Sequence, residues 1–379
     1  MHIDFITHNI VHKFKISNIM KGMRLFMKNV IKIVLVIIAT LIGAGFASGK
    51  EIYSFFFIYK FHGIFGIFIS SFLISVVIYK VLIMCNKNKI NTYQEFCKYV
   101  GNFEKHNQFN VNYKKIDNKF TGLFSNIVNL FLLITYYVMI SGFSSFLKQE
   151  FNINPIIGSI ILTTICYIIF LKNINGLIQI SNYLIPILIT FIIFVSTKNT
   201  NIISNFNNVF NSINLNYNIG ILKCVLYACY NCIILIPVLI PIRKLVTNSK
   251  RIFYISAINF ILLVVLSFSI YNLLLQGNAN IFNLEMPIIE IVKKYGVLYK
   301  NIYILMIGIS ILTTAISAGC GFLNNCNQKR DVYKRNMTCM CISGIFLSQI
   351  SFSVLVNLLY PMLGVIGLFE VLLIFVKYK

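Results

Sequence analysis

The stretch TLIGAGFASGKE, residues 40–51, places three glycines within seven positions of the first long apolar run of the chain. Each glycine destabilises a helix interior by about 1 kcal/mol relative to alanine. In a bilayer, backbone groups freed by a break must be satisfied by protein, water or a bound ion. A break near mid-membrane exposes carbonyls that can coordinate a cation and amides that can hold an anionic solute group. Close helix packing through small residues is the simpler interpretation, but Lys50 and Glu51 follow directly, and charges inside a span are typical of functional positions.

The composition around this stretch is that of an integral membrane protein. Of the 379 residues, 58% are hydrophobic and only 11% are charged, whereas a soluble domain is about half apolar and a quarter charged. The polar residues are too few to coat a water-facing surface, so lipid is the expected solvent. The net charge of +23 falls in a few segments between apolar runs. Anionic lipid headgroups are the expected partners of this charge, and the absence of a basic face with stacking aromatics argues against nucleic acid.

Ten apolar runs are long enough to form an all-α membrane domain, since a spanning helix needs about 20 apolar residues. A Tyr-Pro turn at residues 360–361 is expected to separate the ninth run from the tenth. With the N-terminus inside, 25 Lys and Arg fall in cytoplasmic segments and 8 outside, which predicts a multi-pass plasma-membrane protein with both termini cytoplasmic. The predicted spans are residues 31–58, 62–85, 120–147, 154–172, 175–197, 218–241, 252–275, 299–323, 337–357 and 361–377.

Two segments between the spans are expected to be amphipathic helices. Residues 92–100 lie in the polar cytoplasmic loop between the second and third spans. Residues 276–297 are expected to form an external helix over the membrane surface, between the seventh and eighth spans. A solvated connector is the simpler interpretation of both.

Glu51 and Glu370 are the only acidic residues well inside apolar spans. Nine ångströms or so of helical rise separate Glu51 from the centre of its span near Gly45, which keeps it within the hydrocarbon depth. Glu51 could carry a proton, bind a cation, or be neutralised by Lys50 near an aqueous vestibule.

Two further segments carry polar groups at membrane depth. In the sixth span, Asn231 needs partners for its amide and Pro237 removes a backbone donor, so a second helix break is expected there; a lone proline kink is the alternative. In the eighth span, four hydroxyls recur at i, i+3, i+4 and i+7 and therefore share one helical face. Such hydroxyls often bond back to their own helix, but together they also form an oxygen-lined site suited to Na⁺. These four residues are Ser310, Thr313, Thr314 and Ser317.

An enzyme is not expected. The sequence contains no P-loop, no HExxH and no nucleophile elbow, and no cofactor is expected. The ten cysteines lie mostly in apolar spans and lack the spacing of zinc ligands, so no metal is expected beyond Na⁺.

The strings GAGFASGKE at 43–51, YVMISG at 137–142, Tyr230-Asn231 and LTTAIS at 312–317 resemble the bacterial YkvI-like membrane proteins. The similarity covers roughly residues 30–377. This family is regarded as part of the amino acid–polyamine–organocation superfamily. The resemblance implies a LeuT-like fold of two inverted five-helix repeats, roughly 30–197 and 218–377, with the first and sixth helices broken. The domain itself would cover residues 30–379, after a cytoplasmic extension over residues 1–29.

The resemblance also implies the site residues. The solute would bind between Gly43, Ala44, Gly45 and Ser48 of the first helix and Tyr230 and Asn231 of the sixth. The carbonyls of Ile42 and Gly45, with Ser310, Thr313 and Thr314, would match a sodium site, and Glu51 is a further candidate for a cation or proton. Lys50 stands where the family usually has Gln, and its charge could replace or repel that cation.

The expected function is secondary active transport of a small, amino-acid-like organic solute by alternating access, coupled to Na⁺ or H⁺. The alternative is a membrane receptor or sensor that keeps the fold and binds its ligand without transporting it. The sequence leaves open which solute is bound and which ion drives it.

Overall fold

The computed structural model describes residues 27–101, 111–198, 217–246, 248–277, 280–326, 330–347 and 352–378. In this part of the chain every regular element is a helix. Most of the expected N-terminal extension lies outside the described residues. The elements are a helix over residues 27–41, α2 (Ala44–Ala47), α3 (Lys50–Phe55), η1 (Phe57–Tyr59), α4 (Lys60–Lys87), α5 (Tyr93–Gly101), α6 (Val111–Phe151), α7 (Pro155–Phe170), α8 (Ile174–Ser196), α10 (Tyr217–Ile242), η2 (Arg243–Leu245), α11 (Ser249–Leu274), η3 (Ile281–Asn283), α12 (Pro287–Lys293), α13 (Val297–Cys326), α14 (Arg330–Leu347) and α15 (Phe352–Lys377).

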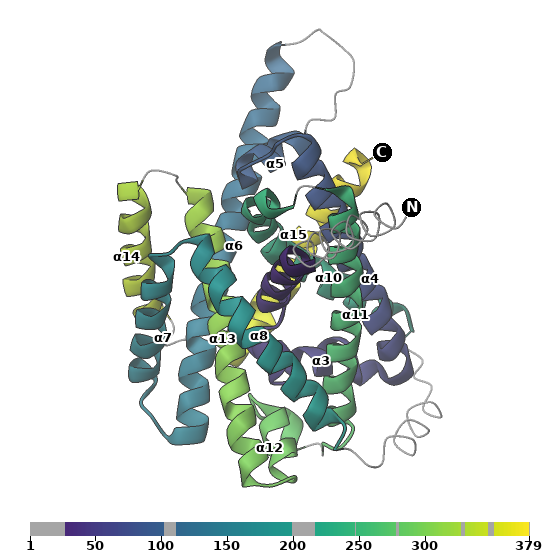
Figure 1. The fold of residues 1–379 in the computed structure, drawn as a ribbon, viewed down its shortest axis with the longest axis vertical. Coiled ribbons are helices and arrows are strands. Elements are labelled where there is room, and N and C mark those ends of the chain that lie inside the picture. Colours follow the sequence, from purple (N-terminus) through teal and green to yellow (C-terminus); the bar gives the residue numbers. More distant parts are fainter. Residues whose placement is uncertain are drawn as a thin grey trace, which may run out of the picture.

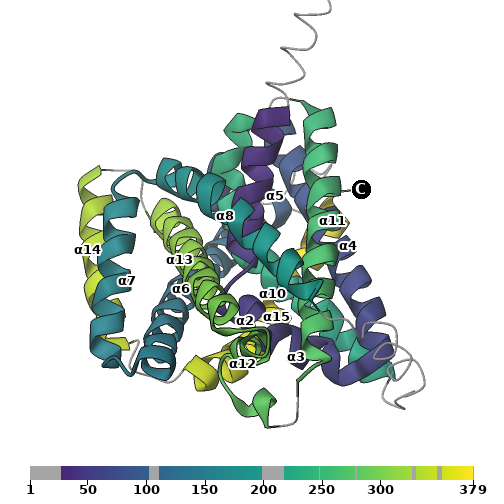
Figure 2. The same cartoon turned by 60° about the horizontal axis from the view of Figure 1, so that its bottom comes forward.

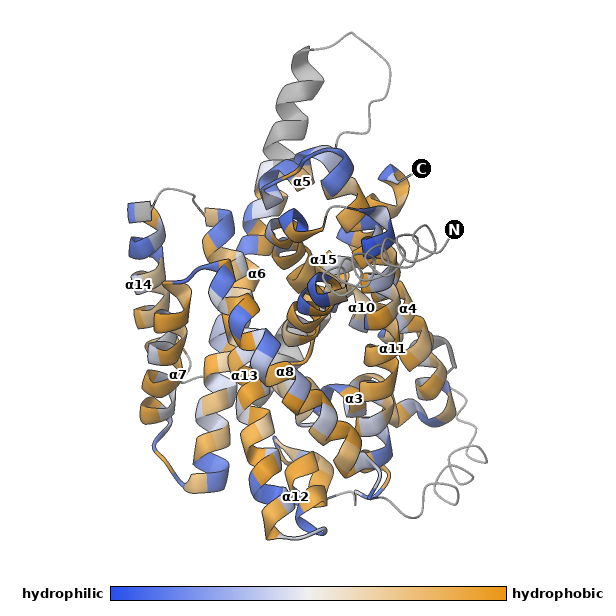
Figure 3. Ribbon diagram, in the orientation of Figure 1, coloured by the Kyte–Doolittle hydropathy of each residue, from blue (hydrophilic) through white to orange (hydrophobic). Residues whose placement is uncertain are grey.

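Six helical segments in the described ranges are long and apolar enough to cross a membrane. They are Lys50–Lys87, Gly122–Phe151, Ile174–Ser196, Gly220–Leu245, Ser249–Leu274 and Val297–Cys326. Apolar residues fill the middle of the molecule, and polar residues gather at its two ends (Figure 3). The structure is therefore an all-helical membrane bundle.

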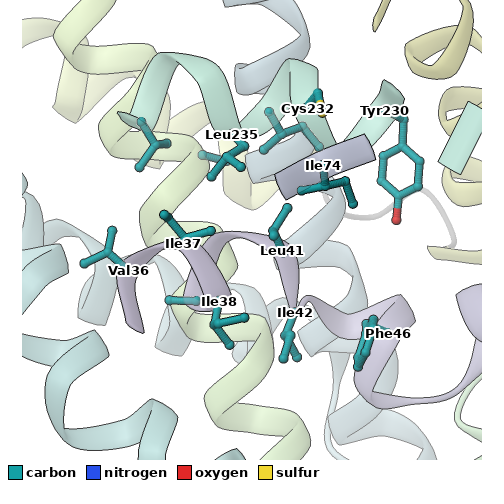
Figure 4. Packing of buried hydrophobic residues seen from close by; sticks show 14 of the residues in the cluster. Val36, Ile37, Ile38, Leu41, Ile42, Phe46, Ile74, Tyr230, Cys232 and Leu235 are labelled. Atoms are coloured by element: carbon teal, nitrogen blue, oxygen red, sulfur yellow. The ribbon is translucent and has the colours of Figure 1, made fainter. Parts of the chain in front are cut away.

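The helix over residues 27–41 lies in the middle of this bundle (Figures 1 and 2). Every residue from 33 to 49 is buried, which is the pattern of a helix surrounded by other helices. Val36, Ile37 and Leu41 pack among residues of α10 and α4, including Leu235 and Ile74 (Figure 4). The glycine-rich stretch therefore lies in the core, where a break can only face protein or a bound molecule.

Two expectations about helix boundaries are wrong. Helix α10 runs from Tyr217 to Ile242 without the expected break. The amide of Asn231 bonds the carbonyl of Tyr227 in the same helix, at 2.9 Å, so it supports the helix instead of interrupting it. Helix α15 likewise begins at Phe352 and passes through Pro361, where a turn was expected, because membrane helices tolerate proline when neighbours satisfy the freed carbonyl.

Helices α10 and α15 approach each other at backbone distance. A methyl group at Gly367 of α15 would collide with the backbone carbonyl of Cys229, and one at Gly364 would lie 3.2 Å from the carbonyl oxygen of Leu226. Small residues permit this kind of close contact between membrane helices.

The two short helices between the long ones lie at opposite ends of the molecule. Helix α5 lies at the end where α15 finishes, and α12 lies at the other end (Figure 1). Each falls where the sequence predicts an amphipathic helix, and each buries one side, with Tyr93 and Phe96 inward on α5 and Ile288 and Val292 inward on α12.

Candidate functional site

The glycine-rich stretch breaks the first helix twice. The helix ends at residue 41, residues 42 and 43 are not helical, and a single turn, α2, follows before a second break at Ser48 and Gly49. Gly49 has φ +85°, a left-handed conformation that favours glycine. A Cβ at Gly49 would also lie 2.7 Å from Cγ1 of Ile288 on α12. The sequence prediction of a broken first helix is thus realised as two breaks separated by one turn.

Hydroxyl groups of α13 meet the end of the first helix at the first break. Ser310 donates to the carbonyl oxygen of Ile42 at 2.9 Å. Thr314 contacts the same carbonyl at 3.0 Å and that of Ala39 at 3.1 Å. All these groups are buried. Four oxygens from two helices therefore converge at one point, which we call the oxygen cluster: the carbonyls of Ala39 and Ile42 and the hydroxyls of Ser310 and Thr314.

The structure brings together only part of the predicted cation set. The hydroxyl of Thr313 donates to the carbonyl of Ser310 in its own helix, at 3.1 Å. Thr313 is therefore a neighbour of the oxygen cluster in sequence and does not contribute its hydroxyl to it. The carbonyl of Gly45 accepts from the hydroxyl of Ser48 at 3.2 Å, inside the α2 turn. Sequence reasoning missed the carbonyl of Ala39, although it lies three residues before Ile42 and hence on the same side of the last turn.

Glu51 lies at the break, buried with 4% of its surface exposed. Its side chain folds back over α2, because a Cβ at Gly45 would lie 2.7 Å from Cγ of Glu51 and 2.8 Å from its Cδ. The hydroxyl of Tyr230 on α10 donates to the Glu51 carboxylate. Two predicted solute residues, Gly45 and Tyr230, therefore both contact the predicted cation or proton residue.

The other predicted solute residues have different surroundings. Gly43 faces α13, since a Cβ there would lie 3.4 Å from the side chain of Thr314. Ala44 is buried in α2, and Asn231 is bonded to its own helix, as described above. A residue that the sequence did not single out, Tyr303 of α13, donates to the carbonyl of Ala47 at 2.8 Å and so holds the α2 turn.

Aromatic rings line the α10 side of the break. The rings of Tyr227 and Tyr230 meet edge to face with centroids 5.4 Å apart, and Phe55 lies 5.8 Å from Tyr230. Each ring is buried. The carboxylate of Glu51 therefore lies at the edge of an apolar, aromatic surface, which is the usual character of a small-molecule site with a few polar groups.

The end of the molecule that carries α12 is closed over the second break. The backbone amide of Ile288 donates to the carbonyl of Ser48 at 3.2 Å, and Nζ of Lys50 donates to the carbonyl of Phe282 at 2.7 Å. Tyr53 stacks on Phe282 with ring centroids 4.4 Å apart. The ammonium of Lys50 is thus bound by η3.

The end that carries α5 has a large polar cavity of about 880 Å³. Its lining comes from the α5 region, the α7–α8 turn, the end of α10, α13 and α14. The polar and charged lining residues are Asn91, Glu95, Asn173, Lys244, Asn324, Tyr333 and Lys334. The α12 end has a hollow of its own, of about 660 Å³, between η3 and α12, lined by Asn280, Ile281, Leu284, Glu290, Lys293 and Lys294.

Comparisons with known proteins agree with this architecture. No protein-family model matches the chain. The chain is 24% identical over 339 residues to the uncharacterized membrane protein YkvI of Bacillus subtilis (strain 168), covering 88% of this chain and 91% of that protein. This confirms the resemblance to YkvI-like membrane proteins. Among solved structures, the fold matches a Na⁺-coupled sialic acid symporter in a substrate-bound outward-open state, with TM-score 0.61 and 14% identity over 88% of this chain and 75% of the symporter. At that identity the match shows the shared fold.

Proposed function

We propose that this protein is a secondary active transporter that moves a small, amino-acid-like organic solute by alternating access, driven by Na⁺ or H⁺. The observation that carries the proposal is the doubly broken first helix in the core, with the oxygen cluster on one side and Glu51 and Tyr230 on the other. Discontinuous helices at mid-membrane are where transporters bind solute and coupling ion. The fold shared with a Na⁺-coupled symporter supports the same function.

Na⁺ fits the oxygen cluster. Hard cations are bound by oxygen ligands, and every group that converges there is a carbonyl or hydroxyl oxygen. The carbonyls of Ala39 and Ile42 also belong to the C-terminal end of the first helical half, where the helix dipole favours positive charge. Ser310, Thr314, Ala39 and Ile42 would hold the ion, with Thr313 beside them, and the ion would join the first helix to α13.

The solute would bind at the α2 turn, facing α10. Gly43, Ala44, Gly45 and Ser48 provide the backbone of the turn, and Tyr230 and Asn231 lie on the facing helix. Glu51 is the group there that can exchange a proton or bind a cation, because its carboxylate is buried and held by the Tyr230 hydroxyl. Coupling to H⁺ would therefore act at Glu51, and coupling to Na⁺ at the oxygen cluster.

The proposed architecture is a ten-span domain over residues 30–379, made of two inverted repeats near 30–197 and 218–377, with both termini in the cytoplasm. The positions of α5 and α12 support an inverted pair. Helix α5 follows the second predicted span of the first half and α12 the second of the second half, and they lie at opposite ends of the molecule (Figure 1). Inverted repeats place equivalent loops on opposite sides of the membrane in this way.

The test is solute accumulation by the purified protein in liposomes, under a Na⁺ gradient and separately under a H⁺ gradient. A thermal-unfolding screen of amino acids and related compounds first identifies a ligand, since a ligand at 100 times its Kd stabilises the folded state by about 2.7 kcal/mol. Accumulation against a gradient supports the transporter. Binding with no accumulation under either gradient refutes transport and favours a receptor or sensor on the same fold.

Matched variants separate the two ions. Thr314→Val removes a hydroxyl from the oxygen cluster, and Thr164→Val removes an exposed hydroxyl of α7 that bonds only its own helix. Glu51→Gln removes the ionisable group and keeps the shape of the side chain. A Na⁺-driven transporter loses ion dependence in Thr314→Val, a H⁺-driven one in Glu51→Gln, and neither loses it in Thr164→Val.

A further inference from the structure

Helix α15 contains a buried carboxyl group that the proposed solute and sodium sites do not use. Glu370 is 2% exposed. Its Oε1 accepts a hydrogen bond of 2.7 Å from the hydroxyl of Tyr93 on α5. Its Oε2 is buried and has no hydrogen-bond partner among the described residues. Buried polar atoms without a partner are rare in folded proteins, so this one requires a physical explanation.

A small cavity lies against the carboxyl group. Its volume is about 20 Å³, which is enough for one water molecule. Apart from Glu370 and the thiol of Cys97, the lining is apolar or backbone: Phe96, Val100 and Gly101 of α5, Phe124 of α6, and Leu373 of α15. Such a space offers the carboxyl group about one water molecule, fewer than an ion needs for its hydration.

The surroundings favour the neutral acid. An ionised carboxylate accepts several hydrogen bonds over its two oxygens, whereas the described surroundings of Glu370 supply one. A protonated acid needs one donor for its carbonyl oxygen Oε1, which is the Tyr93 hydroxyl, and one acceptor for its Oε2 hydroxyl, such as a single water molecule. Burial raises the pKa of the Tyr93 phenol well above its usual range, which keeps Tyr93 a donor.

Charged and titratable groups on the neighbouring elements do not change this conclusion. Cys97 of α5 lines the cavity beside the carboxyl group, and burial raises the pKa of its thiol. Cys232 of α10 is buried, and α6 contributes Phe124 to the cavity. From α4, the ammonium of Lys80 lies over the rings of Phe375 and Tyr378, at 4.2 and 4.3 Å from their centroids. The ammonium of Lys377, on α15 itself, lies over Tyr99.

We infer that Glu370 is a proton-binding site, and that its proton is held while α5 packs on α15. The carboxyl group is neutral while Tyr93 and the apolar side of α5 cover it. When α5 withdraws, water reaches the group, the O–H bond breaks, and the proton passes to that water and to the solvent at the α5 end. Because the covered form is the protonated form, α5 packs more firmly at low pH and is released as the pH rises.

Infrared difference spectroscopy of the purified, full-length protein tests the proton directly. A protonated carboxylic acid has its own carbonyl band. We expect a band at neutral pH that vanishes in Glu370→Gln and persists in Glu95→Gln, which changes an exposed carboxylate of α5. Tyr93→Phe should keep the band and move it to higher frequency, because the carbonyl oxygen loses its donor.

Labelling of the buried Cys97 with a maleimide, read by peptide mass spectrometry, tests the link to α5. At alkaline pH we expect Cys97 to react about tenfold more slowly in Glu370→Gln than in the wild type. If one proton is linked to the packing of α5, the fraction of molecules with α5 released changes about tenfold for each pH unit. The neutral amide keeps α5 packed while the wild-type carboxyl group loses its proton. The wild-type spectrum is informative even if a variant fails to fold: absence of any protonated carboxyl band that disappears on raising the pH overturns the inference. Identical Cys97 rates in the wild type and Glu370→Gln overturn the link to α5.

Discussion

Replacing Gly45 by alanine gives the sharpest test of how the break is built. The added Cβ would lie 2.7 Å from Cγ and 2.8 Å from Cδ of Glu51, closer than nonbonded carbon atoms approach, so the glutamate must leave its place over α2. Overpacking a buried site costs about 1–3 kcal/mol. The displaced carboxyl group also leaves the Tyr230 hydroxyl, a group of the proposed solute site. We expect Gly45→Ala to lower the free energy of unfolding by about 1–3 kcal/mol and to weaken solute binding.

The same glycine motif supplies the control. A Cβ at Gly43 meets the side chain of Thr314 at 3.4 Å and Sδ of Met139 at 3.6 Å, which are ordinary contacts. Gly43→Ala should therefore cost much less than Gly45→Ala, although both replace glycine by alanine in the same break.

A double-mutant cycle isolates the cause. Glu51→Ala removes Cγ, Cδ and the carboxylate, so adding Gly45→Ala to that background should cost little. The cycle should give a coupling energy of about 1–3 kcal/mol, within the range seen for residues in contact. The assay is equilibrium unfolding in detergent, with solute affinity measured in parallel. Equal losses for the two alanine variants, or a coupling energy near zero, would refute the placement of Glu51 over Gly45.

Three further changes probe the elements around the break. Thr314→Val should weaken Na⁺ binding about tenfold, because it removes one of the four oxygens of the cluster and a loss of about 1.4 kcal/mol is one factor of ten. Na⁺-dependent melting measures the affinity, and an equal loss in Thr164→Val would contradict the expectation. Lys50→Met should speed amide hydrogen exchange in η3 and α12, because the ammonium no longer holds the η3 carbonyl; unchanged exchange there would show that the contact restrains nothing. Gly49→Ala should destabilise the protein by at least about 1–2 kcal/mol, the cost of a left-handed residue with a Cβ, because the Cβ would also collide with Ile288. Gly122→Ala, whose methyl group would meet open space, should be neutral or slightly stabilising in the same unfolding assay.

The first break could be predicted because its causes are local. Three glycines and two charges occupy one short run, and the hydroxyls that face it recur at helical spacing in a second run. The contribution of Ala39 was missed because a backbone carbonyl carries no mark in the sequence. The contact between Tyr93 and Glu370 was equally invisible, since 277 positions separate the two residues and only the fold brings α5 onto α15.

The expected break in α10 shows where local reasoning is insufficient. Asn231 and Pro237 both disturb a helix in isolation, but the amide of Asn231 is satisfied within the helix and no glycine lies near it to favour another backbone conformation. Packing on α4 and α15 then decides the outcome. Asn231 therefore does not mark a break in this helix.

The first helix is broken and α10 is continuous, so we expect the two helices to move in different ways. The first helix is broken at residues 42–43 and 48–49, so the segments on either side of the α2 turn can change their angles independently. Helix α10 has no break between Tyr217 and Ile242 and contacts α15 at backbone distance through Gly364 and Gly367, so we expect the two helices to move together. A tilt of this helix pair would move Tyr230 at the break and Glu370 beneath α5 together, and would thereby couple the core of the molecule to its α5 end.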